Sequence, residues 1–234
     1  EDKKNYHIIL LAKSFAGLRN LYRLVSLSHL QYFGGKPKRP RMTKGLIEQY
    51  RDDIIIGSAC AAGEVYRAIL SGASHEELLQ IADFYDYLEI QPCGNNQYLL
   101  RDDRYPEINT WEDLQTINKK ILALGDELGK LVVATCDVHF LNPEDAIARR
   151  ILQAGMGYPD EEQPPLYLRT TEEMLEEFSY LGKERAYEVV VENTNKINDM
   201  IEKFKPVPDR DQLYSPMIPG AKEKVESMSY GSAH

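Results

Sequence analysis

Asp137 and His139 are the two side chains in this sequence best placed to do chemistry together. They follow residues 131–135, an uncharged stretch rich in apolar and β-branched residues, which predicts a buried parallel strand. Side chains two residues apart on an extended chain point to one face, and a carboxylate beside an imidazole can bind a divalent metal ion. The alternative is an aspartate that caps a turn next to a hydrogen-bonded histidine.

Cys60 has the equivalent place in an earlier part of the chain. It lies between a strand expected at residues 53–58 and a helix expected to reach Leu70. Open α/β sheets and barrels bind ligands where their strands end and their helices begin, so Cys60 is a further candidate ligand. A single cysteine in this position can equally be a small apolar residue packed in the core.

Alternating strands and helices must position these residues. Besides the two strands already named, the periodicity predicts strands at residues 6–12 and 86–91 and helices at 17–33, 44–51, from Ser74 and at 110–129. Asn142 and Pro143 predict a helix start directly after the candidate site. This alternation predicts an α/β fold with a parallel sheet or barrel. Four strands are too few for a closed barrel, so either the sheet is open or further strands lie upstream.

The pattern changes after Gly155. Residues 157–165 form an acidic, proline-rich connection, Thr170 or Thr171 starts a helix, and a second helix is expected at about 183–204. Residues 206–234 are rich in proline and predict an extended linker. The expected organisation is therefore a β/α portion at 1–155, a helical extension at 156–205 and a linker at 206–234.

Composition narrows the class of protein. The 234 residues are 43% hydrophobic and 28% charged, as in a soluble globular protein. No apolar run approaches the length of a membrane span, and the charged N-terminus has neither a signal core nor an initiator methionine. We therefore expect a segment of a longer protein without a membrane contact. Its three unpatterned cysteines favour a reducing cytoplasm.

The net charge of the chain limits the kinds of molecule that it can bind. A net charge of −9 disfavours a protein that binds nucleic acid over its whole surface. One local exception is the basic loop from Lys36 to Lys44, which could contact phosphates or an acidic neighbouring domain, or could simply be solvated. Its prolines exclude a regular recognition helix. We expect an exposed loop that does not read duplex DNA.

Several separate blocks resemble one known family. Residues 6–13, 17–21, 56–60 and 134–145 resemble the PHP domain (polymerase and histidinol phosphatase) of bacterial replicative DNA polymerases. Residues 24–29, 39–41 and 168–175 bring the resemblance closer to the PolC-type alpha subunits of polymerase III. The resemblance covers nearly the whole chain. It implies a partial PHP-type β/α barrel with parallel strands, followed by C-terminal helices.

The resemblance also implies a metal site. Four positions match metal ligands of the family: His7, Cys60, Asp137 and His139. His7 is identified by the resemblance alone, and it stands at the start of its expected strand. The family's upstream ligands and its inserted exonuclease would precede Tyr6. No residue here matches a catalytic or a further cofactor-binding position, because the family's polymerase aspartates lie downstream in the palm.

The resemblance implies that this chain is part of a larger enzyme. The parent would be a DNA-directed DNA polymerase, a nucleotidyltransferase with 3'–5' exonuclease activity that replicates the chromosome in the cytoplasm. Its expected cofactors are zinc or manganese at the PHP site and magnesium for polymerisation. Its expected partners are the upstream PHP half, the exonuclease and the palm of the same chain, DNA, and replisome subunits.

Two alternatives belong to other classes of protein. One is a stand-alone metal-dependent phosphoesterase of the PHP superfamily. The other is a metal-free interaction domain in which His7 and Cys60 are core residues. Under the favoured interpretation, the isolated chain neither polymerises nor degrades DNA.

Overall fold

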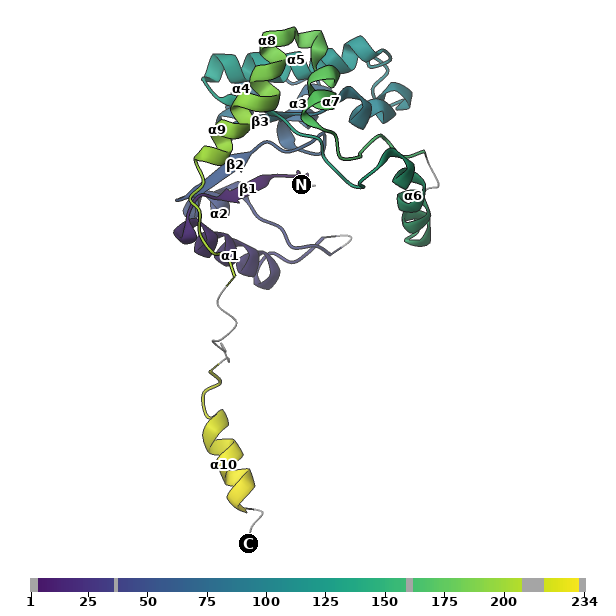
Figure 1. Ribbon diagram of the computed structural model, residues 1–234. Helices are drawn as coiled ribbons and strands as arrows, with labels where there is room; N and C mark the ends of the chain where they lie inside the picture. The colour runs from purple at the N-terminus through teal and green to yellow at the C-terminus, as the bar shows by residue number, and fades with distance from the viewer. Residues whose placement is uncertain (1–3, 36–37, 159–161, 208–216, 232–234) are drawn as a thin grey trace. The chain divides into compact units, whose positions relative to one another are not determined.

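The computed structural model describes residues 4–35, 38–158, 162–207 and 217–231. The chain divides into two units, residues 1–203 and residues 204–234. The first unit holds a four-stranded sheet and most of the helices (Figure 1). Among the described residues of the second unit, Ala221–Gly231 form helix α10, within a stretch whose sequence predicts an extended linker.

The first unit begins with four strands and with helices that, except for η1, were expected from the sequence. The strands are β1 (Ile9–Ala12), β2 (Ile54–Gly57), β3 (Tyr87–Ile90) and β4 (Leu131–Ala134). The helices between them are α1 (Phe15–Leu30), α2 (Lys44–Gln49), α3 (Glu64–Leu70), α4 (His75–Asp83), the 3-10 helix η1 (Cys93–Arg101) and α5 (Trp111–Leu128). Ser74, the expected start of α4, forms a capping box with Glu77, in which the two side chains bond to each other's unpaired backbone amides.

Shorter helices follow β4. They are η2 (Pro143–Asp145), α6 (Ala146–Gly155), α7 (Thr171–Glu177) and η3 (Ser179–Leu181). A helical run then continues through α8 (Lys183–Tyr187), the π-helical segment η4 (Glu188–Glu192) and α9 (Asn193–Asp199). None of the helices that the structure describes is long and apolar enough to cross a membrane.

The sheet confirms the α/β class and corrects one detail of it. Its strands lie in the order β1-β2-β3-β4, and β2, β3 and β4 run parallel, as the alternation predicts. β1 runs antiparallel to β2, with Ile9 opposite Gly57 and Ala12 opposite Ile54. The connection through α1 and α2 thus returns the chain so that β1 and β2 run in opposite directions, whereas the connection through α3 and α4 leaves β2 and β3 parallel.

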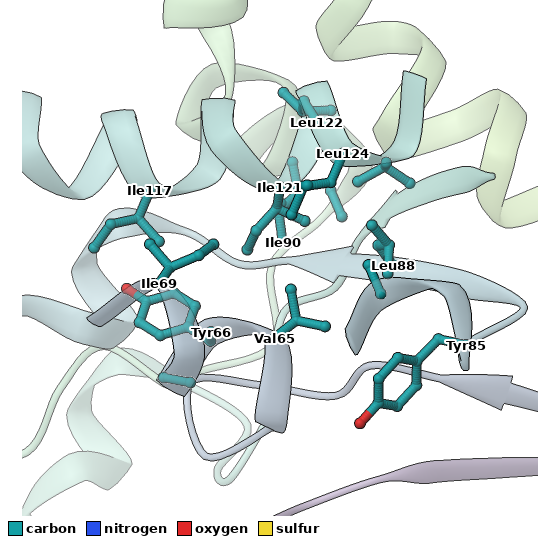
Figure 2. Packing of buried hydrophobic residues seen from close by; sticks show 14 of the residues in the cluster. Val65, Tyr66, Ile69, Tyr85, Leu88, Ile90, Ile117, Ile121, Leu122 and Leu124 are labelled. Carbon is teal, nitrogen blue, oxygen red and sulfur yellow. The ribbon is translucent and has the colours of Figure 1, made fainter. Parts of the chain in front are cut away.

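Alternate residues of the strands face two different cores. Ile56, Leu88 and Ile90 point into the larger core, which α3 and α5 cover with Val65, Tyr66, Ile69, Ile117, Ile121, Leu122 and Leu124 (Figure 2). Ile55, Tyr87 and Val133 point to the opposite face, where they pack against Ile197 of α9. Burial on both faces explains why the strands are nearly free of charge.

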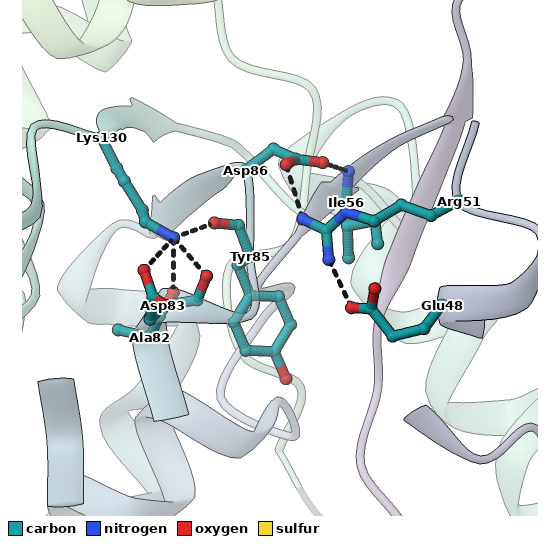
Figure 3. A network of polar contacts seen from close by, with 8 residues as sticks. All are labelled: Glu48, Arg51, Ile56, Ala82, Asp83, Tyr85, Asp86 and Lys130. Carbon is teal, nitrogen blue, oxygen red and sulfur yellow. Dashed lines mark hydrogen bonds and ion pairs between the residues drawn. The ribbon is translucent and has the colours of Figure 1, made fainter. Parts of the chain in front are cut away.

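A polar network holds the sheet at the amino ends of its parallel strands (Figure 3). Arg51 donates to Asp86 Oδ1 at 2.7 Å, and Asp86 Oδ2 accepts from the backbone of Ile56 at 2.7 Å. Lys130, which precedes β4, donates to the backbone oxygens of Asp83 and Tyr85 at 2.5 and 2.6 Å. These bonds join the starts of β2, β3 and β4, at the opposite end from the candidate ligands.

The outer edge of β4 is partly closed. The Thr135 amide donates to Ile90 of β3 at 3.0 Å. Because backbone groups alternate along a strand, Val132 must face away from β3. Its carbonyl oxygen accepts from the side-chain amide of Asn193 at 2.9 Å, and Asn193 is buried. The helical run after α7 thus covers the start of this edge.

Two glycines provide a matched test of this packing. A Cβ atom at Gly17 in α1 would overlap the backbone oxygen of Asp53, whereas one at Gly45 in α2 would meet nothing within 4 Å. We expect Gly17→Ala to lower the free energy of unfolding by about 1–3 kcal/mol, because neither backbone can yield easily. Gly45→Ala should raise it by roughly 0.5 kcal/mol, because alanine favours the helix. Urea denaturation measures both, and equal effects would show that α1 does not approach Asp53 closely.

Candidate functional site

The direction of β1 brings His7 to the rim where the other candidate ligands lie. His7 precedes β1, Cys60 follows β2, and Asp137 follows β4. Because β1 runs antiparallel to β2, its start lies beside the end of β2. The His7 amide donates to the Ala62 oxygen at 3.0 Å, which fixes this arrangement.

His7 and Cys60 form the first pair. The Sγ atom of Cys60 lies 3.5 Å from His7 Nδ1. Burial raises the pKa of the Cys60 thiol, and the negative charges of Asp137 and Glu89 raise it further. The turn that carries Cys60 closes through a 2.7 Å bond from the Gly63 amide to the Cys60 oxygen.

Asp137 and His139 form the second pair. His139 Nδ1 lies 2.8 Å from the backbone oxygen of Asp137 and 4.0 Å from its Oδ1 atom. Because a carbonyl oxygen can only accept, Nδ1 carries the proton in this arrangement. In the neutral form of the ring, Nε2 then carries the lone pair that a histidine needs when it binds a metal through that atom.

The backbone is strained beside both pairs. Asp137 has φ +50°, and Ala59, next to Cys60, has φ +60°. Left-handed backbone at a residue with a Cβ costs on the order of 1–3 kcal/mol and tends to occur at functional sites. The surrounding bonds must therefore hold these two turns in place.

Arg169 anchors the turn that carries Asp137. Its Nη1 donates to Cys136 Sγ at 3.5 Å, and its Nε donates to Glu177 at 3.1 Å. The guanidinium also lies over the Tyr167 ring, at 4.4 Å from the centroid, and the Arg169 side chain is only 1% exposed. A buried cation with this many contacts fixes Cys136, and with it the neighbouring Asp137.

Buried polar groups around Cys136 are incompletely paired. Asn95 Nδ2 donates to the Cys136 oxygen at 2.9 Å. Among the described residues, Asn95 Oδ1 and Arg169 Nη2 are buried without a hydrogen-bond partner. Two such atoms near one turn are unusual, because unpaired buried polar groups cost stability.

Glu89 is a further polar residue at this rim that was not predicted from the sequence. This residue lies within β3 and is buried, and its Oε1 accepts from Thr135 Oγ1 at 2.7 Å and from Gln91 Nε2 at 3.3 Å. Its amide donates to Ser58 Oγ at 2.9 Å. Glu89 thus links the ends of β2 and β4. A charged residue inside an otherwise apolar strand was the signal that could have revealed it.

The four predicted ligands form two pairs rather than one cluster. Within the described part of the chain, no three His, Cys, Asp or Glu side chains gather in a way that could hold a metal ion. A cavity of about 670 Å³ is lined by His7 but not by Cys60, Asp137 or His139. The assignment of these four residues as metal ligands of an intact protein therefore stays a prediction. The donor types suit zinc or manganese, but their arrangement in this chain does not make a complete site.

The basic loop is only partly within the described residues, because 36 and 37 lie outside them. Residues 38–40 are exposed, while Arg41 and Met42 are half-buried. Arg39 and Gly34 exchange backbone hydrogen bonds at 3.0 and 3.1 Å, so the loop is closed at its base. No helix forms in residues 38–43, as the prolines predict.

Glu89 allows a test in which the expected effect depends on pH. Burial raises its pKa, so the folded state binds this proton more readily than the unfolded chain. The stability contributed by this proton is present below the unfolded pKa of about 4.3 and is lost as pH rises through the folded pKa. Glu89→Gln keeps a carbonyl acceptor and removes the buried charge. We expect it to be more stable than the parent at pH 7, with the difference vanishing at acid pH. Urea denaturation at several pH values measures this.

Glu176→Gln is the control for that series, because Glu176 is exposed on α7. It should change the free energy of unfolding little at any pH. A Glu89→Gln variant less stable than the parent at pH 7 would show that the carboxylate has a favourable partner.

Arg169→Met tests the anchoring of the Asp137 turn. Methionine keeps an apolar stem but loses the bonds to Cys136 and Glu177, so we expect a loss of about 1–3 kcal/mol in unfolding free energy. Hydrogen exchange at the His139 amide, which donates to Leu166 at 2.8 Å, should accelerate. Arg104→Met is the control, because that side chain is 73% exposed and surface pairs contribute little. Unchanged exchange at His139 would exclude the anchoring role.

Comparisons with known proteins identify a matching family model and several similar polymerases. Residues 1–93 match the family model described as the PHP domain. A DNA polymerase III of the PolC type from Clostridium perfringens strain 13 is 52% identical over 98% of this chain. The PolC-type polymerase of Bacillus subtilis strain 168 is 44% identical over 100% of the chain, and that of Thermotoga petrophila is 42% identical over 99%.

The chain spans only 15–16% of the length of these three relatives. Their similarity extends well beyond the 93 residues that the PHP model matches, and it includes α6, α7 and the helical run after them. The resemblance found in the sequence is therefore confirmed: residues 1–93 match the PHP-domain model, and the chain is similar, over nearly its whole length, to a segment of PolC-type DNA polymerases III.

Proposed function

We propose that this chain is the PHP-domain segment of a PolC-type replicative DNA polymerase, in which it is a scaffold and supplies part of a metal site. The observation that carries this proposal is the alignment of 98–100% of the chain with PolC-type polymerases at 42–52% identity. The parent enzyme would synthesise DNA, and its polymerase active site would lie outside this chain.

The rim geometry supports the metal part of the proposal. His7, Cys60, Asp137 and His139 come from three different strand ends and reach the same rim. Thiolate and imidazole donors favour zinc, and the added carboxylate also suits manganese. Because the two pairs do not make a complete site, residues elsewhere in the parent would supply the remaining ligands. Magnesium, which prefers oxygen donors, suits the polymerisation site instead.

This chain's own residues would prepare the ligands. The backbone oxygen of Asp137 holds the proton of His139 on Nδ1. Arg169 and Asn95 fix Cys136 from two sides. Preorganised ligands lose less freedom when a metal binds, and their supporting partners typically change metal affinity by about 10–100-fold.

The proposal extends to organisation and partners. We propose a β/α portion at residues 1–155, a helical extension at 156–205 and a linker toward the palm at 206–234. The partners would be the rest of the polymerase chain, DNA and replisome subunits in the cytoplasm. A stand-alone phosphoesterase is not favoured, because the relatives named above are polymerases about six times longer than this chain.

Activity assays test the proposal. The purified chain should neither extend a primer nor degrade single-stranded DNA with manganese or zinc, because the polymerase carboxylates and the remaining ligands are absent from it. The full-length polypeptide should extend the primer. Metal content, measured by mass spectrometry, should be higher in the full-length polypeptide and fall in its Asp137→Asn variant.

The same assays can contradict it. DNA cleavage by the purified chain that disappears in Asp137→Asn would show that this half-site is sufficient, and the chain would then be a nuclease. A full-length polypeptide that does not extend primers would exclude a polymerase. Equal metal content in the full-length polypeptide and its Asp137→Asn variant would remove Asp137 from the ligands, and absence of metal from both would favour a metal-free interaction domain.

A further inference from the structure

Helix α6 is amphipathic, but its apolar side faces solvent. Four large apolar side chains, Ile147, Ile151, Leu152 and Met156, are exposed by 65%, 66%, 69% and 74%. Steps of four, one and four residues spread them over about half of the helix circumference, with Ile151 and Leu152 in the middle and Met156 at the C-cap. No residue of α6 is buried.

The polar side of α6 faces the protein. Arg149 bonds to the Gln163 side chain, and both Arg149 and Gln153 are half-buried. A surface helix of a globular protein normally has the opposite orientation. Figure 1 shows α6 standing apart from the other helices of its unit, and η2 is its main neighbour.

We infer that the apolar side of α6 is a docking surface for another segment of the same, longer polypeptide. The inference rests on the proposed function. The relatives are about six times longer than this chain, and 98–100% of the chain aligns with them. The counterpart of α6 therefore lies inside a much longer polypeptide, and a segment with an apolar surface is the occupant that fits this stripe. Exposed apolar stripes of this kind mark interaction surfaces.

The position of α6 gives the docking a consequence. The helix starts at Ala146, directly after η2, and η2 follows the turn that carries Asp137 and His139. A segment bound to α6 would hold the far end of that turn. Docking would therefore couple the rest of the polymerase to the candidate ligands.

Cysteine labelling tests the inference. Ile151→Cys is labelled in the purified chain and in the full-length polypeptide, and mass spectrometry reads the modification at residue 151 alone. Labelling should be fast in the chain and roughly 100-fold slower in the full-length polypeptide, because the interface must open first. Leu152→Cys repeats the test, Gln153→Cys reports the side that already faces the protein, and labelling in guanidinium gives the unfolded rate.

Three outcomes overturn the inference. Equal rates at residue 151 in both proteins would show that nothing in the polypeptide covers α6. Labelling of the purified chain that slows as its concentration rises would show that a second copy is the occupant. Fast labelling of the full-length polypeptide that slows only when anionic lipid vesicles are added would assign α6 to a membrane surface. Primer extension by the same full-length sample separates failure of the docking from failure of the proposed function.

Discussion

The antiparallel pairing of β1 with β2 is the constraint on which the candidate site depends. If β1 ran parallel to its neighbours, His7 would lie at the amino ends of the strands, beside Arg51 and Asp86. Because β1 runs in the opposite direction, His7 Nδ1 lies 3.5 Å from Cys60 Sγ instead. The two ends of the sheet therefore differ in the kinds of contact that they make. Ion pairs and backbone bonds hold the amino ends together, and the carboxyl ends carry the groups that can bind a ligand.

The carboxyl ends contain features that lower stability. Glu89 is a buried carboxylate whose pKa is raised by burial, and Asp137 and Ala59 have left-handed backbone. Asn95 and Arg169 each leave a buried polar atom unpaired among the described residues. The amino ends share one of these features, because Asp53, directly before β2, has φ +58°, whereas the ammonium group of Lys130 there donates to three backbone oxygens. Among the described residues, the buried carboxylate of Glu89 and the two unpaired polar atoms do gather at the carboxyl-end rim, as in a site selected for binding rather than for stability.

Much of the fold followed from local patterns. Uncharged runs located β2 and β4 because strands buried on both faces exclude charge. Ser74 with Glu77 located the start of α4 because capping residues act within one turn. The direction of β1 could not be predicted in this way, since it depends on how α1 and α2 pack. The helix α10 was missed because its sequence has few large apolar residues and no strong start signal.

The candidate ligands could be selected from the sequence, but the residues that support them could not. Asp137 and His139 stood out by spacing and Cys60 by its place after a strand, whereas His7 required the family resemblance. Glu89 and Arg169 escaped notice because their roles come from contacts across 46 and 33 residues of sequence, with Thr135 and Cys136 respectively. Left-handed backbone at Asp137 was equally hidden, since residues with a Cβ seldom adopt it.

The side-chain amide of Asn193 limits where a further strand could pair with the outer edge of β4. A strand from another polypeptide segment that paired along β4 would find the Val132 oxygen already occupied. Strand addition would therefore have to start beyond Val132, toward Ala134 and the rim that carries Asp137. The same side chain shortens the part of the β4 edge that is available for pairing between copies, which opposes edge-to-edge aggregation along β4.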